Sequence, residues 1–136
     1  MSFTIYLIGY GNQGPTQFLK RLEPVEPALV LDIRARRNSW CWNYRYNRLG
    51  DLLRRAGHEY MWLPDLGNAN GHNGKIRLVN EAFGMMALEA QMDRSDLPIV
   101  LLCAEFRSTD CHRAEVARRL AERLAKRGIK LEVRGL

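Results

Sequence analysis

The chain has 136 residues, of which 46% are hydrophobic and 26% charged, as in an ordinary globular domain. No apolar run approaches the roughly 20 residues that cross a bilayer, and the first residues lack a secretory signal pattern, so we expect a cytoplasmic protein without a membrane partner. The net charge of +6 favours either an anionic partner, a small anion or nucleic acid, or a solvated basic surface.

Strand patterns and helix patterns alternate along the chain. Short apolar runs predict strands at 3–8, 28–33, 60–63, 99–102 and 130–133. Helical spacing predicts helices that begin at Pro15 and that span 49–56, 78–92 and the stretch between the N-cap Asp110 and the stop Gly128. We therefore predict one α/β domain over 1–136, a single three-layer domain of about five mostly parallel strands with helices on both faces. The segments after Ile8, Ile33 and Leu102 should then face one cleft.

Two polar stretches interrupt this alternation. The stretch 38–47 contains an aromatic series: Trp40, Trp42, Tyr44 and Tyr46. These rings either stack nucleic-acid bases beside Arg45 and Arg48 or cover the sheet edge, and we expect Trp42 and Tyr46 to pack in the core or at that edge. The stretch 65–74 is rich in Gly and Asn, and we expect a functional lid or a mobile loop with an exposed His72.

The densest set of reactive side chains follows the fourth predicted strand. Cys103 ends that strand, Glu105 follows it, and Cys111, His112 and Arg113 open the next helix. A helix N-terminus favours anions, and a guanidinium can grip an oxyanion with two hydrogen bonds. We therefore predict an anion site with Cys111 and Arg113 as ligand-binding residues, Cys103 as nucleophile or redox thiol, and Glu105 or His112 as proton carrier. The alternative is a structural charge network around a buried Cys103.

Further polar residues lie at the ends of the first two predicted strands. Asn12 lies in the turn after the first strand, and Asp32 and Arg34 end the second. We predict Asn12 and Arg34 as ligand-binding residues and Asp32 as a catalytic acid or base. An internal ion pair between Asp32 and Arg34 is an equal alternative.

Zinc is a weaker interpretation of the cysteines. The odd count of three favours reduced thiols, and no Cys-x-x-Cys motif is present. Cys103, Cys111 and His112 can ligate zinc with Glu105 or Asp32 as fourth ligand, but adjacent helix residues point to different sides. We therefore predict no metal site.

A dinucleotide cofactor is also a weak interpretation. Gly9-x-Gly11-x-x-Gly14 formally matches the dinucleotide fingerprint, with Asp32 after the second strand. Pro15, however, places the helix start after the third glycine, whereas the fingerprint needs a helix that begins within the loop. We expect no cofactor and keep a Rossmann-like nucleotide-binding protein as a second alternative.

Several short motifs recur in the order of a known family. They are Ile8-Gly-Tyr-Gly-Asn12, Leu31-Asp-Ile-Arg34, Tyr46-Asn47, Gly57 with Tyr60, Leu63, Leu66-Gly67, Leu102-Cys-Ala-Glu105 and Cys111-His-Arg113. On these motifs the chain resembles the domain-of-unknown-function 488 family of small bacterial and archaeal proteins. The resemblance implies an α/β domain with Cys103, Glu105, Cys111, His112 and Arg113 as signature positions, and it implies no agreed reaction.

The sequence leaves the enzyme question open. Our leading hypothesis is a thiol-dependent enzyme that acts on a phosphorylated or other anionic ligand at the N-terminus of the last helix. The first alternative is a nucleic-acid-binding or interaction module in which the Cys/Glu/His/Arg cluster is structural.

Overall fold

The computed structural model describes residues 1–39, 41–70, 75–104 and 112–136. The strands are β1 (Ser2–Gly9), β2 (Leu29–Asp32), β3 (Glu59–Trp62), β4 (Ile99–Cys103) and β5 (Lys130–Gly135). The α-helices are α1 (Pro15–Leu22), α2 (Asn47–Arg55), α3 (Glu81–Arg94) and α4 (His112–Ala125). Short 3-10 helices lie at η1 (Glu23–Val25), η2 (Trp42–Tyr44) and η3 (Pro64–Leu66).

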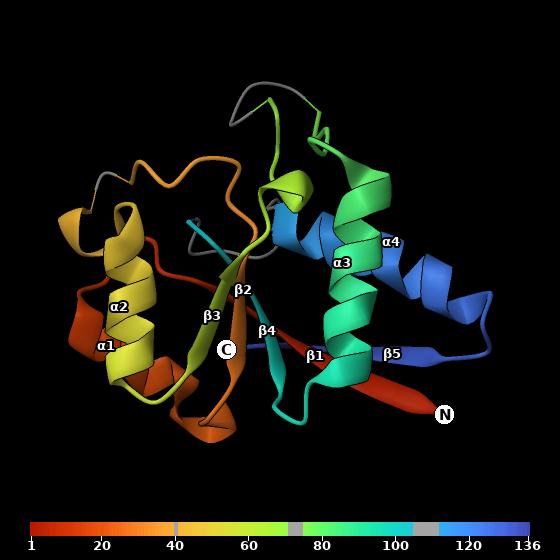
Figure 1. Cartoon of the computed structure of the whole chain (residues 1–136), viewed down its shortest axis with the longest axis horizontal. Helices are drawn as coiled ribbons and strands as arrows, with labels where there is room; N and C mark the ends of the chain where they lie inside the picture. The colour runs from red at the N-terminus through yellow and green to blue at the C-terminus, as the bar shows by residue number, and fades with distance from the viewer. Residues whose placement is uncertain (40, 71–74, 105–111) are drawn as a thin grey trace.

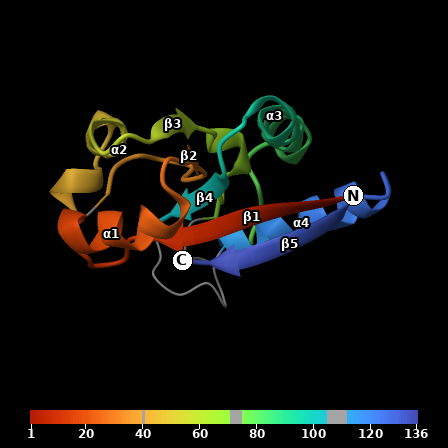
Figure 2. The ribbon, with the colours of Figure 1, turned by 90° about the horizontal axis from the view of Figure 1, so that it is seen from below.

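The five strands form one sheet in the order β3-β2-β4-β1-β5, and every pairing is parallel (Figure 1). Helices α1 and α2 cover one face of this sheet, and α3 and α4 cover the other (Figure 2). The predicted α/β architecture is therefore confirmed, and the sheet is wholly parallel. Parallel pairing brings the carboxyl ends of the strands to one edge, as the cleft prediction requires.

Side chains along the central strands alternate between the two faces. On β4, Leu101 and Cys103 belong to the core that includes residues of α3 and α4, whereas Val100 and Leu102 belong to the core that includes residues of α1 and α2. The strands β2 and β4 are buried along their whole length, which explains their unbroken apolar sequence. The alternation decides on which side of the sheet each site residue lies.

The third helix begins later than its sequence pattern predicts. Helix α3 begins at Glu81 rather than at Leu78, because the Asn80 side chain caps it by accepting a hydrogen bond from the Phe83 amide at 3.3 Å. Leu78 instead forms an isolated antiparallel bridge with Asn68. The apolar spacing at 78–92 thus includes residues that precede the helix.

The expectation that Trp42 and Tyr46 pack in the core or at the sheet edge is wrong. Their side chains are 56% and 58% exposed, whereas Tyr44 between them is fully buried. Residues 42–44 form a 3-10 helix, which has three residues per turn, so the alternating aromatic pattern does not place these rings on one face.

The described part of the chain contains no helix long and apolar enough to cross a membrane. Cys41 is a free thiol. Trp40, His72 and the predicted N-cap Asp110 lie outside the described residues.

Candidate functional site

A pocket of about 1000 Å³ opens at the carboxyl edge of the sheet. Segments that follow several strands line it: Tyr10 to Asn12 after β1, Arg34 to Arg36 after β2, Asn68 to Asn70 beyond β3, and Ala104 after β4. Gly11 ties two of these segments together, because its amide donates to the Ala104 carbonyl at 2.8 Å. The predicted cleft is therefore present among the described residues.

His112, the first residue of α4, contributes an imidazole to the pocket wall. Its Nε2 lies 2.7 Å from the backbone carbonyl oxygen of Ile33, and the residue is only 8% exposed. A carbonyl oxygen can only accept, so Nε2 carries the proton, and in the neutral ring Nδ1 is the basic nitrogen. The β2 segment thus fixes the tautomer of a histidine from α4.

Asp32 and Arg34 form a buried ion pair beside the pocket. Arg34 donates from Nε to Asp32 Oδ1 at 2.9 Å and from Nη2 to Asp32 Oδ2 at 2.7 Å. The Tyr60 hydroxyl donates to the same Oδ2 at 2.6 Å. This geometry is that of the internal ion pair.

The environment of this pair favours the charged guanidinium. Burial works against the charge of Arg34, but the hydrogen bonds and the negative charge of Asp32 outweigh it and raise the Arg34 pKa above its usual value. The pKa of Tyr60 is also raised, first by burial and then by the adjacent Asp32 charge. The Tyr60 phenol therefore stays protonated and remains a donor to the carboxylate.

Two tyrosines that were not predicted as site residues complete the environment of Arg34. Its Nη1 donates to the Tyr10 hydroxyl at 3.2 Å and to the Tyr44 backbone oxygen at 2.7 Å. The rings of Tyr10 and Tyr44 also contact each other, with centroids 4.1 Å apart. Tyr10 lies between two glycines in the turn after β1. The motif was interpreted through these glycines, so no role for the tyrosine was predicted.

Cys103 and Arg113 lie on the other side of the sheet. Cys103 is fully buried, Arg113 is 2% exposed, and Arg113 Nη1 lies 2.7 Å from Cys103 Sγ. A guanidinium that donates to sulfur stabilises a thiolate over a thiol. Cys103 belongs to the core that includes residues of α4, whereas Asp32 contacts Tyr60, which packs against the core that includes residues of α1 and α2.

The structure therefore divides the predicted site residues. Asn12, Arg34 and His112 line the carboxyl-edge pocket. Asp32, Cys103 and Arg113 are buried and are not among its lining residues. Glu105 and Cys111 lie outside the described residues.

Cofactor motifs find little support in the geometry. Within the described ranges no three His, Cys, Asp or Glu side chains are grouped as metal ligands. Helix α1 begins at Pro15, directly after Gly14, and a Cβ added at Gly14 would contact nothing within 4 Å. The close helix–strand approach that the third glycine of a dinucleotide fingerprint permits is therefore missing at this described residue.

Comparison with known proteins identifies one family. A family model described as "Domain of unknown function DUF488" matches residues 15–120, which is more than half of the chain. No curated protein and no solved structure matches the chain.

Proposed function

Because the chain belongs to the family described as domain of unknown function DUF488, whose name assigns no reaction, we propose a function from its geometry. The chain is an enzyme that binds a phosphorylated or similar anionic ligand in the carboxyl-edge pocket and moves a proton through His112. One observation carries this proposal: a pocket-lining imidazole whose tautomer is set by a 2.7 Å hydrogen bond to Ile33.

The character of the pocket lining supports an anionic ligand. Asn12, Asn38, Asn68 and Asn70 contribute amides, and the exposed Arg36 contributes a positive charge. Helix α4 begins at the pocket with His112, so the positive end of its dipole lies beside the ligand. Arg34 supports the pocket wall while its own charge is neutralised by Asp32.

Cys103 is the thiol of the proposed enzyme. Its sulfur contacts the Arg113 guanidinium, and the next residue, Ala104, reaches the pocket surface. A reactive role requires that a reagent reach the buried sulfur from the pocket without unfolding of the protein.

The first test follows phosphate binding at His112. Inorganic phosphate at millimolar concentration should shift the ¹⁵N resonance of His112 Nδ1, because an oxyanion beside the ring changes its environment. The His112→Gln variant keeps an N–H donor for the Ile33 carbonyl but lacks the basic nitrogen, and it should fold while losing proton transfer. Unchanged histidine resonances at saturating phosphate would contradict an anion site.

The second test measures alkylation of Cys103. In a Cys41→Ala/Cys111→Ala background, iodoacetamide should label Cys103 faster than the protein unfolds, and phosphate should slow the labelling. Labelling that occurs only at the rate of global unfolding would assign Cys103 to the core and remove the thiol from the proposed mechanism.

A further inference from the structure

The segment from Arg36 to Arg48 presents positive charge without carboxylate partners. It contains Arg36, Arg37, Arg45 and Arg48 and no Asp or Glu. None of these arginines forms an ion pair within the part of the chain that the structure describes. Arg37 donates to Asn47 Oδ1 at 3.0 Å, and Arg45 donates to the Ser39 carbonyl at 2.8 Å. These neutral partners leave the positive charge uncompensated.

Aromatic rings, instead of carboxylates, contact the guanidinium groups of three of these arginines. The Arg48 guanidinium carbon lies 3.7 Å from the centroid of the Trp42 ring, and that of Arg45 lies 5.6 Å from it. Arg37 lies 4.1 Å from the centroid of the Trp62 ring. A guanidinium stacked on a ring keeps the N–H groups around its edge available for phosphate oxygens. The stacking therefore organises these arginines without neutralising them.

Two of the described rings of this segment are open to solvent. Trp42 is 56% exposed and Tyr46 is 58% exposed. Exposed rings that alternate with arginines are the usual stacking platform for unpaired bases. We call the six residues that carry this pattern the arginine–aromatic surface: Arg36, Arg37, Trp42, Arg45, Tyr46 and Arg48.

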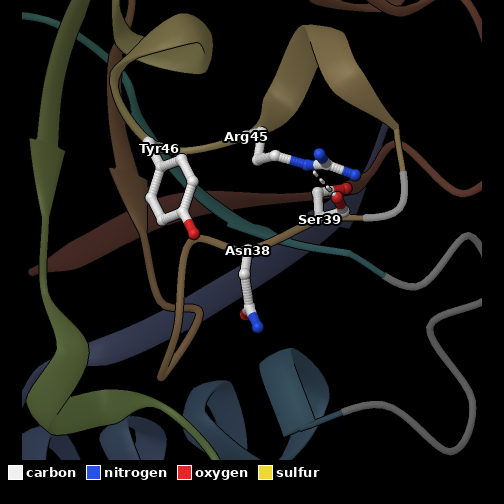
Figure 3. Close-up of a pocket in the computed structure, with 4 residues that line it drawn as sticks. All are labelled: Asn38, Ser39, Arg45 and Tyr46. Atoms are coloured by element: carbon white, nitrogen blue, oxygen red, sulfur yellow. Dashed lines mark hydrogen bonds between the residues drawn. The ribbon is translucent and has the colours of Figure 1, made fainter.

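A hollow of about 390 Å³ lies within this surface, lined by Asn38, Ser39, Arg45 and Tyr46 (Figure 3). The Tyr46 ring and the Arg45 side chain stand on either side of it, above Asn38 and Ser39 (Figure 3). Asn38 and Ser39 also line the carboxyl-edge pocket, so the two hollows adjoin. An exposed asparagine amide beside a ring offers a donor and an acceptor to a base edge.

The backbone holds Tyr46 in this place at a conformational cost. Tyr46 has φ +50°, a left-handed value that side chains rarely adopt, and its amide donates to the Arg37 carbonyl at 2.6 Å. Strained residues of this kind gather at binding sites, because only a surrounding structure can maintain them. The strain here exposes a ring next to two arginines.

We propose that the arginine–aromatic surface binds single-stranded nucleic acid. Phosphates contact Arg36, Arg45 and Arg48, and unpaired bases stack on Trp42 and Tyr46. A duplex would hide the base faces that these rings require, and an acidic peptide would not engage the rings. The proposal stands apart from the enzyme proposal, because it needs neither His112 nor Cys103.

The test compares two double variants that each remove two positive charges. Binding of fluorescent oligo(dT) and oligo(rU) is followed by anisotropy at several salt concentrations. Arg45→Ala/Arg48→Ala should weaken binding about tenfold or more and reduce the salt slope by about 1.4, since each phosphate contact in single strands contributes about 0.7. Arg118→Ala/Arg127→Ala, on α4 and just beyond it, removes arginines that are paired with glutamates and should leave binding unchanged.

Two further variants test the rings. Trp42→Leu keeps an apolar side chain but removes the π face, and it should weaken binding about tenfold. Tyr46→Gly should weaken binding without lowering the free energy of unfolding, because glycine adopts a positive φ without strain.

The possible outcomes separate the alternatives. Equal losses in the two arginine double variants would mean that total charge, and not this surface, attracts the oligonucleotide. Binding to vesicles of phosphatidylserine without binding to either oligonucleotide would assign the surface to membranes. Each of these results overturns the proposal, and neither affects the phosphate test at His112.

Discussion

The arginines of α4 and those of the arginine–aromatic surface have the same side chain in opposite surroundings. On α4, Arg118 pairs with Glu115 and Glu122, and Arg119 pairs with Glu115 and Glu81. These contacts hold the pKa of Glu115 at about 2, because the hydrogen bonds of Arg118 and Arg119 outweigh the effect of burial.

The segment 36–48 has rings, amides and carbonyls where α4 has carboxylates. The excess positive charge of +6 is therefore unevenly distributed over the surface. The neighbours of the arginines, and not their number, therefore determine where this molecule attracts anions.

Arg34 lies between these two cases, since it adjoins the arginine–aromatic surface but has a carboxylate partner. Asp32→Asn should lower the free energy of unfolding by about 3–5 kcal/mol, because it leaves a buried guanidinium without its counter-charge. Urea denaturation at neutral pH measures the loss. Glu115→Gln, at a solvent-facing pair, should cost far less, and equal losses would show that burial does not govern these pairs.

Gly67 lies against the backbone at the start of the arginine-bearing segment. A Cβ at Gly67 would lie 2.3 Å from the Ala35 backbone, next to Arg34, so Gly67→Ala should cost about 3 kcal/mol and displace the start of the arginine-bearing segment. Gly84→Ala, on α3, is a milder comparison: its Cβ would meet the buried Leu66 side chain at 2.6 Å and the Asp65 backbone at 3.2 Å, but alanine favours a helix. The melting temperature of Gly67→Ala should therefore be well below that of Gly84→Ala in thermal denaturation.

His58 supplies a pH-dependent contribution to stability on the α1–α2 side of the sheet. Its Nδ1 accepts from the Ala28 amide at 3.1 Å, and burial lowers its pKa, with a smaller opposing effect from Glu26. Below about pH 6.5 the unfolded chain binds a proton that the folded chain resists, so stability is complete above this pH and falls as the pH decreases.

The His58→Asn variant isolates this term, because asparagine offers an acceptor without titrating. Between pH 7 and pH 5 the wild type should lose more stability than the variant, as measured by urea denaturation at each pH. Parallel pH profiles for the two proteins would contradict the assignment to His58.

The smallest effect on oligonucleotide affinity is expected when the carboxylates that pair with Arg118 are removed. Glu115→Gln/Glu122→Gln removes the carboxylates around Arg118 and should strengthen oligonucleotide binding by a few fold, with a steeper salt dependence. The gain stays small because the described contacts of Arg118 include no ring. If the gain in affinity equalled the loss in Arg45→Ala/Arg48→Ala, ring contacts would not be needed for an arginine to bind the oligonucleotide.

Local chemistry in the sequence determined the order of the elements and the ion pairs between neighbouring turns of α4. Apolar runs marked β2 and β4, Pro15 marked the start of α1, and Glu115 lies three and four residues before Arg118 and Arg119, the spacing of ion pairs on a helix. These features depend on neighbours within one turn or one strand, so the sequence contains the information. The family match at residues 15–120 likewise confirms the resemblance.

Tertiary structure decided which of the reactive residues meet. Cys103 and Asp32 end neighbouring strands, but side-chain alternation and strand register place them against different cores, which no spacing in the sequence specifies. Arg34 forms hydrogen bonds with Tyr10 and Tyr44, and His112 forms one with the Ile33 carbonyl, between residues that are distant in the sequence. The exposure of Trp42 and Tyr46 likewise depended on a 3-10 turn and a positive φ, because a sequence pattern records which side chains alternate but not the backbone path that turns them toward solvent.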